Sequence, residues 1–141
     1  MPRFMVFVRA TPSSEGAAEP TPEILSAVGT YNASLLAAGV LLAGEGLVPS
    51  SRDSVRITPG ASPKVEEGPF PTNELVSGWW ILKVKDVQEA VEWARKCPEG
   101  CGVLEVRRIA EMEDFGEALG EEGRKREAEM REQMEKLARG E

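Results

Sequence analysis

The chain has 141 residues, with 17 Lys or Arg, 24 Asp or Glu and no His, so its formal net charge is −7 at pH 7. This acidic balance argues against a nucleic-acid binder, because such proteins neutralise phosphates with a basic surface. The absence of histidine excludes Ser-His-Asp and Cys-His catalysis, histidine-ligated zinc and an imidazole base. Chemistry carried by carboxylate, Cys, Tyr or Lys side chains or by a cofactor remains. A chain of this length is expected to form one domain with an appendage.

No apolar run approaches the roughly 20 residues that span a bilayer, and residues 1–10 are too short and wrongly flanked for a signal peptide. We therefore expect a cytoplasmic protein with no membrane partner. The two cysteines, Cys97 and Cys101, are separated by three residues, and no second pair or His completes a zinc shell. We favour two ordinary thiols over a functional pair, and we expect no cofactor and no metal.

The first part of the chain predicts a strand followed by a helix. Residues 3–9 carry large apolar side chains at both odd and even positions, so both faces of this strand need cover. After a loop, Thr21 supplies an N-cap and Pro22 the first helical residue, and Gly39 ends the helix. The apolar stripe of this helix consists of Ile24, Val28, Tyr31 and Leu35, is widened by Leu25 and Leu36, and encloses Asn32.

Four more strands are predicted in the middle of the chain. They cover residues 40–43, 54–58, near 64–67 and 76–85. In the second of these, Val55 and Ile57 claim the helix side of the sheet, so Arg56 has to point to the opposite side. In the last of them, Trp80, Leu82 and Val84 face one way, and Trp79, Ile81 and Lys83 face the other.

A second helix and a last strand complete the pattern. Asp86, with Glu89 three residues later, is a capping-box variant that opens the helix. Residues 103–109 form the strand, and its alternation turns Glu105 and Arg107 away from the helix-packed core.

The end of the chain is dominated by charge. Between residues 121 and 141, 13 of 21 residues are charged, and Glu is repeatedly followed by Lys or Arg four positions later. This pattern predicts a solvated helix, with partner binding as the alternative. We therefore divide the chain into a folded domain at residues 1–118 and a charged helical tail at residues 119–141.

The order strand, helix, strand, strand, helix, strand predicts an α+β, ferredoxin-like antiparallel sheet with both helices on one face. The other face would carry one apolar set of the first strand together with Trp79 and Ile81, a larger exposed patch than monomers usually tolerate. No further apolar helix is available to cover this patch. We therefore expect a homodimer in which two sheets pack face to face.

Several short segments, in this order, resemble the YCII-related family and its branch named for an Asp-Gly-Pro-Phe motif. They are residues 3–12, Tyr31-Asn32, residues 43–47, Gly68-Pro69-Phe70, Glu74-Leu75, residues 78–82 and residues 105–107. The likeness covers about residues 1–115. It implies a dimeric α/β-barrel fold, shared with small lactone isomerases and dehalogenases, and a possible regulatory setting, because genes of this branch often neighbour extracytoplasmic-function sigma factors.

Two positions depart from the family pattern. The Asp of the motif is replaced by Glu67, which keeps a carboxylate but moves it by one methylene. The His/Asp pair proposed as catalytic in other members cannot exist in a chain without histidine. The acid-base mechanism of those members therefore does not transfer directly.

Three carboxylates are candidate general bases. Glu45 lies between two glycines in an expected loop, where it is either a desolvated base or a surface residue. Glu67 and Glu74 flank a rigid turn that contains Gly68, Pro69 and Phe70. If the two carboxylates converge, their pKa values would separate, as acid-base work requires, and otherwise they are unrelated surface groups.

We expect a small anionic ligand between the sheet and its loops, because a guanidinium fork suits a carboxylate or a phosphate. The candidate ligand-binding residues are Arg9, Asn32, Arg56, Phe70, Trp79 and Arg107. Asn32 contacts either a ligand or a nearby loop, and the arginines either bind the anion or pair with Glu side chains such as Glu105. Two functions follow: a cofactor-independent isomerase, lyase or dehalogenase that uses a carboxylate base, and a non-catalytic ligand-binding or stress-associated regulatory dimer.

Overall fold

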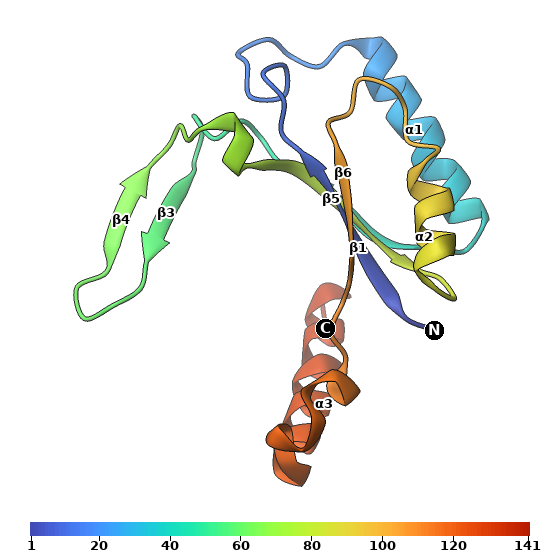
Figure 1. The fold of residues 1–141 in the computed structure, drawn as a ribbon, viewed down its shortest axis with the longest axis vertical. Coiled ribbons are helices and arrows are strands. Elements are labelled where there is room, and N and C mark those ends of the chain that lie inside the picture. The colour runs from blue at the N-terminus through green and yellow to red at the C-terminus, as the bar shows by residue number, and fades with distance from the viewer. The chain divides into compact units, whose positions relative to one another are not determined.

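The computed structural model describes all 141 residues, which form two compact units at residues 1–109 and 110–141. In the first unit, four antiparallel strands form one sheet in the order β2-β5-β1-β6. Two helices cover one face of this sheet, and within the unit the other face is open (Figure 1). The elements are β1 (Arg3–Arg9), α1 (Pro22–Ala37), β2 (Leu41–Gly46), β5 (Val76–Lys83), α2 (Val87–Ala94) and β6 (Leu104–Arg108). The predicted α+β, ferredoxin-like order is confirmed.

The core lies between the sheet and the two helices. Alternate residues of β1 and β5 are buried there, as the sequence pattern predicts. Tyr31 of α1 packs edge-on against Trp80, with ring centroids 5.3 Å apart, and its hydroxyl donates to the carbonyl of Trp93 at 2.7 Å. The buried residues are Phe4, Val6, Val8, Tyr31, Leu35, Val40, Trp80, Leu82, Val84, Ala90 and Ala94.

Both predicted helix starts are present. The side chain of Thr21 accepts a hydrogen bond from the amide of Ile24 at 3.2 Å, and Pro22 follows it as the first helical residue. The carboxylate of Asp86 accepts from the amide of Glu89 at 2.9 Å, and the Glu89 side chain accepts in return from the amide of Lys85 at 3.1 Å. Each cap satisfies amide groups that have no partner inside the helix.

The segment between β2 and β5 differs from the prediction. Strands β3 (Val55–Thr58) and β4 (Lys64–Glu67) pair with each other in a separate two-stranded sheet and do not join the main sheet. The expectation that Val55 and Ile57 pack toward the helices is therefore wrong, because 56% and 60% of their surfaces are exposed. The strict alternation of this segment is that of a hairpin, whose two faces need not be a core face and a solvent face.

Strand β2 begins one residue later and ends three residues later than the predicted segment at residues 40–43. Glu45 therefore lies in the strand, opposite Trp79, and not in a loop. The glycines on this strand pair make the extension possible, because a Cβ on Gly44 would lie 2.8 Å from the Trp80 ring and a Cβ on Gly78 would lie 2.8 Å from the Glu45 carbonyl. Gly44 of β2 and Gly78 of β5 therefore leave the space that this close strand pairing needs.

Helix α1 is also narrower in its contacts than the sequence suggests. Leu25 and Leu36, expected to widen the apolar stripe, are exposed. The contact with the core is made by Tyr31 and Leu35, supported by Val28. A helix that crosses a twisted sheet touches it along a line, so the flanks of its stripe stay in solvent.

The second unit is helical. A 3₁₀ segment, η2 (Met112–Leu119), precedes α3 (Gly120–Ala138), which confirms a charged C-terminal helix. Glu127 pairs with Arg131 at 3.7 Å and Glu132 pairs with Lys136 at 3.0 Å, both four residues apart. The sequence did not predict η2. None of the helices in the structure has the length and apolar character needed to cross a bilayer.

Tyr31 provides a test of this core, because it is the only tyrosine of the chain. Burial raises the pKa of Tyr31 to about 12, and the neighbouring Cys97 and Cys101 thiols act in the same direction. The neutral phenol is thus favoured by folding, so its contribution to stability is complete below pH ~10 and is lost as pH rises from ~10 to about 12.

We expect the tyrosinate absorbance of the folded protein to rise with a midpoint near pH 12, and that of the protein in denaturant near pH ~10. A midpoint near pH ~10 in the folded protein would show that the phenol is solvated. Tyr31→Phe should remove the signal altogether.

Candidate functional site

The open face of the sheet is built from cross-strand rows. One row contains Glu45, Trp79, Phe7 and Glu105, contributed by β2, β5, β1 and β6 in that spatial order. The next row contains Ala43, Ile81, Met5 and Arg107. The side chains of the two central strands in these rows are half-buried and apolar, whereas those at the edges include charged residues. The predicted orientation of Trp79 and Ile81 on this face is confirmed by the burial pattern of β5.

Two arginines converge on one carboxylate at the β6 edge of this face. Arg9 Nη1 lies 3.7 Å from Glu105 Oε1, and Arg107 Nη1 lies 3.3 Å from Glu105 Oε2. The second terminal nitrogen of Arg9 donates to the carbonyl of Asn73 at 2.8 Å. All three charged side chains are at least two-fifths exposed. The ion-pair alternative for Arg107 and Glu105 is therefore realised within one chain, and the cluster keeps one positive charge in excess.

Arg56 forms a second cluster at the base of the hairpin. Its Nη1 donates to Glu74 Oε2 at 2.8 Å, and its guanidinium carbon lies 4.2 Å from the centre of the Phe70 ring. Glu74 belongs to the short 3₁₀ segment η1 (Thr72–Glu74). The face-counting argument for Arg56 is wrong, since β3 lies outside the sheet. Arg56 nevertheless reaches the neighbourhood of Arg9, because the two arginines bind consecutive residues of η1.

A buried serine holds the turn that carries Phe70. The amide and hydroxyl of Ser50 both donate to the carboxylate of Glu15, and the Ser50 hydroxyl accepts from the amide of Phe70 at 3.0 Å. Gly68 packs on the Ser50 carbonyl so closely that a Cβ would lie 1.9 Å from its oxygen. Glu15 and Ser50 thus place Phe70 beneath Arg56. Neither residue was among the candidates, because their sequence separation of 35 leaves no local pattern.

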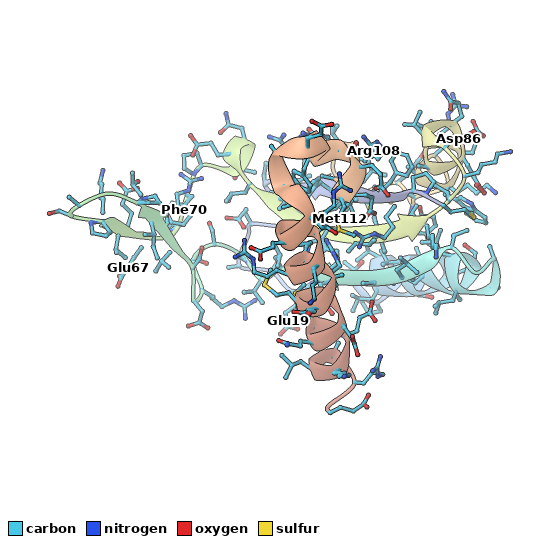
Figure 2. All side chains as sticks on the ribbon, turned by 90° about the horizontal axis from the view of Figure 1, so that it is seen from below. Glu19, Glu67, Phe70, Asp86, Arg108 and Met112 are labelled. Atoms are coloured by element: carbon cyan, nitrogen blue, oxygen red, sulfur yellow. The ribbon has the colours of Figure 1, made fainter.

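The three candidate carboxylates lie in different places. Glu45 is on β2 and belongs to the row that contains Trp79, so it borders the open face. Glu74 pairs with Arg56 in η1. Glu67 lies on β4 opposite Val55, and Figure 2 shows it on the hairpin, beyond Phe70. Glu67 thus takes no part in the ion pair that Glu74 forms with Arg56. Of the three carboxylates, only Glu45 lies on the four-stranded sheet.

Asn32 lies on the helix side of the sheet. Its Oδ1 accepts a hydrogen bond from Trp80 Nε1 at 2.8 Å, so the half-buried amide has a structural partner on β5 rather than in a loop. This bond satisfies the indole N–H inside the core. Asn32 is thus separated by the sheet from the arginines of the open face.

Other features of the first unit offer less chemistry. An open apolar hollow of about 280 Å³ lies between α2 and β6, lined by Val91, Ala94, Arg95, Leu104 and Val106. No group of three or more Cys, Asp or Glu side chains is arranged to hold a metal ion. Burial, together with a hydrogen bond to Cys101, raises the pKa of the Cys97 thiol to about 12. A nucleophilic thiolate is therefore disfavoured at neutral pH.

Comparison with known proteins gives one finding. A family model for the YCII-related domain matches residues 3–113, which include the whole four-stranded sheet and all residues of both arginine clusters. No curated protein matches the chain.

The bond between Asn32 and Trp80 can be tested by changing its acceptor. Asn32→Ala should lower the free energy of unfolding by about 1–3 kcal/mol, because it leaves a buried indole N–H without a partner. Asn32→Asp keeps an acceptor at the same place and should cost less. Equal losses in the two variants, measured by urea unfolding, would contradict the assigned role.

Proposed function

The chain belongs to the YCII-related family, and on that premise we propose that it is a homodimeric protein that binds a small anionic organic compound on the open face of its sheet. Assignment to the branch named for Asp-Gly-Pro-Phe stays a prediction that rests on Gly68, Pro69 and Phe70. The charged edge and the apolar centre of the open face support this proposal.

The observation that carries the proposal is the convergence of Arg9 and Arg107 on the single carboxylate of Glu105. This arrangement already holds one carboxylate between two guanidinium groups, and it has spare positive charge for another anion. Exposed ion pairs contribute only about 0–1 kcal/mol, so a ligand carboxylate could replace Glu105 at small cost. Phe7, directly opposite Glu105 on the neighbouring strand, marks the border between this charged edge and the apolar centre of the face, where the body of the ligand would lie.

The dimer part of the proposal rests on the centre of the same face. Met5, Phe7, Trp79 and Ile81 form a contiguous apolar block on two neighbouring strands, and none of them is fully buried within the chain. Sheets that stack face to face lie about 10 Å apart and interdigitate such side chains. A second copy would therefore cover the block and leave the charged margins around it as the walls of a ligand site.

Binding could lead to a reaction or to regulation, and Glu45 separates these two possibilities. It is the candidate carboxylate that borders the apolar block, in the row of Trp79. As a base it would take a proton from a carbon of the bound acid, and exchange of ligand C–H protons in D₂O would reveal this step. A regulatory dimer needs no such base and would bind the ligand without exchange.

The sheet interface predicts a specific effect of Trp79→Glu. This change should dissociate the dimer, because it would bury a carboxylate without a partner between two apolar surfaces. Leu36→Glu, on the exposed side of α1, is the matched control and should leave the molar mass unchanged. Light scattering of the native protein should give twice the chain mass of 15.3 kDa, and a compact monomer at all concentrations contradicts the proposal.

The anion site predicts opposite effects of two neighbouring changes. Arg107→Met should weaken the binding of a small carboxylate by about ten- to a hundredfold, since it removes a charged hydrogen-bond donor worth roughly 1.5–3 kcal/mol. Glu105→Gln should strengthen binding, because it frees both arginines from their internal carboxylate. Arg95→Met removes a similarly exposed arginine at the C-cap of α2 and is the control.

Calorimetric titration of mono- and dicarboxylates and of phosphate esters measures these effects. The site would be ruled out if no anion binds to the native protein, or if Arg107→Met and Arg95→Met have the same affinity. Weaker binding in Glu105→Gln would show that Glu105 orients the ligand rather than competing with it.

A further inference from the structure

The hairpin of β3 and β4, called the arm below, has two chemically different faces. Directly paired residues share a face, so the pairs Val55 with Glu67 and Ile57 with Val65 place three β-branched apolar side chains together. The opposite face carries Arg56, Thr58, Lys64 and Glu66. The apolar face is uncovered, since Val65, like Val55 and Ile57, exposes more than half of its surface, at 62%.

The interactions that join the arm to the rest of the chain, a backbone hydrogen bond and the contacts of Arg56, come from its base and its polar face. The amide of Gly68 donates to the carbonyl of Ser54 at 3.0 Å and closes the base. Arg56, on the polar face, binds Glu74 and lies over Phe70. Isolated two-stranded hairpins are marginally stable in water, and this one turns its apolar side chains to solvent. The arm therefore carries three apolar side chains, Val55, Ile57 and Val65, that remain exposed within the single chain.

The direction of the arm indicates what covers this face. Figure 1 shows the arm on the side of the sheet that faces away from α1 and α2, and it extends well beyond that sheet face. A second copy that packs on the open face, as proposed above, must therefore lie beside the arm. In a two-fold dimer the contact would form twice, once from each copy.

We infer that the arm of each protomer packs its Val55, Ile57 and Val65 face against the other protomer. This inference rests on the proposed dimer and adds an element to it that the sheet does not provide. Since Arg56 and Phe70 lie at the base of the arm, the partner then forms part of the enclosure around the ligand site. Ligand binding and dimerisation become linked, and an anion that binds the dimer shifts the monomer–dimer equilibrium toward the dimer.

A pair of variants that add the same charge to opposite faces of the arm tests this inference. Val65→Lys places a cation on the apolar face, between Ile57 and the partner, and should raise the monomer–dimer dissociation constant by about tenfold or more, because a hydrated ammonium group would have to enter an apolar contact. Thr58→Lys places the same cation on the polar face and should change the constant by less than about twofold. Both constants come from sedimentation equilibrium, with circular dichroism as the check on folding.

Amide hydrogen exchange of the native protein provides a measurement that needs no variant. The amides of β3 and β4 should exchange slowly at concentrations where the dimer forms and faster where the monomer prevails, whereas β1 and β5 should be protected in both. Protection of the arm that does not depend on concentration would overturn the inference even if Val65→Lys fails to fold.

The outcomes separate this inference from the proposed function. If Trp79→Glu dissociates the dimer and Val65→Lys does not, the sheet interface stands, and the apolar face of the arm belongs to a different partner. If the native protein is monomeric at every concentration, both the dimer and the role of the arm fail.

Discussion

The architecture depends on one constraint: β1 and β5, the two central strands, carry large side chains on both faces, while two helices can cover only one. Phe4, Val6 and Val8 face the helices, whereas Met5 and Phe7 face away from them. Burying the first set forms the core, since each large apolar side chain contributes about 1.5–3 kcal/mol when removed from water. The second set is left for another surface. The proposed dimer and the position of the ligand site both follow from this imbalance.

On the helix side of the sheet, the core packs around Trp80. Its ring packs against Tyr31, its N–H is bound by Asn32, and its bulk requires the absence of a side chain at Gly44 on the neighbouring strand. The same strand pair then brings Glu45 opposite Trp79 on the other face. The composition of the open face is thus partly a consequence of how the core is packed, because residues on one strand alternate between the two.

The open face combines weak polar contacts with a rigid support. The ion pairs of Arg9, Arg107 and Glu105 are exposed, so they hold side chains in place without much energy and can be exchanged for a ligand. Arg56 is supported differently, because Phe70 beneath it is fixed by the buried Ser50 and its bonds to Glu15. In a chain of net charge −7, Arg9 and Arg56 both bind residues of η1, and Arg107 joins Arg9 on Glu105. Three arginines thus meet two carboxylates, Glu74 and Glu105, and this local excess of positive charge favours an anion.

Local sequence patterns were enough to predict the features that depend on residues close together in the chain. Alternation assigned Trp79 and Trp80 to opposite faces, the residues around Thr21 and Asp86 marked both helix starts, and the absence of histidine removed whole classes of mechanism. The element order was sufficient for the four-stranded sheet and its two helices, because a ferredoxin-like sheet places helices and strands by connection rules. The faces of a strand follow from its period of two residues, and those of a helix follow from its period of 3.6 residues.

Tertiary structure decided which segments meet. Alternation in β3 correctly indicated a strand but not its sheet, so Val55 and Ile57 were assigned to a core that they do not enter. The bond between Glu15 and Ser50, and the meeting of Arg56 with Glu74, join residues 35 and 18 positions apart. A periodic pattern indicates the face of a strand or helix on which a residue lies. The partner of that side depends on the path of the chain through turns such as Gly68-Pro69-Phe70, and that turn is held by Ser50 and Glu15, which are distant from it in the sequence.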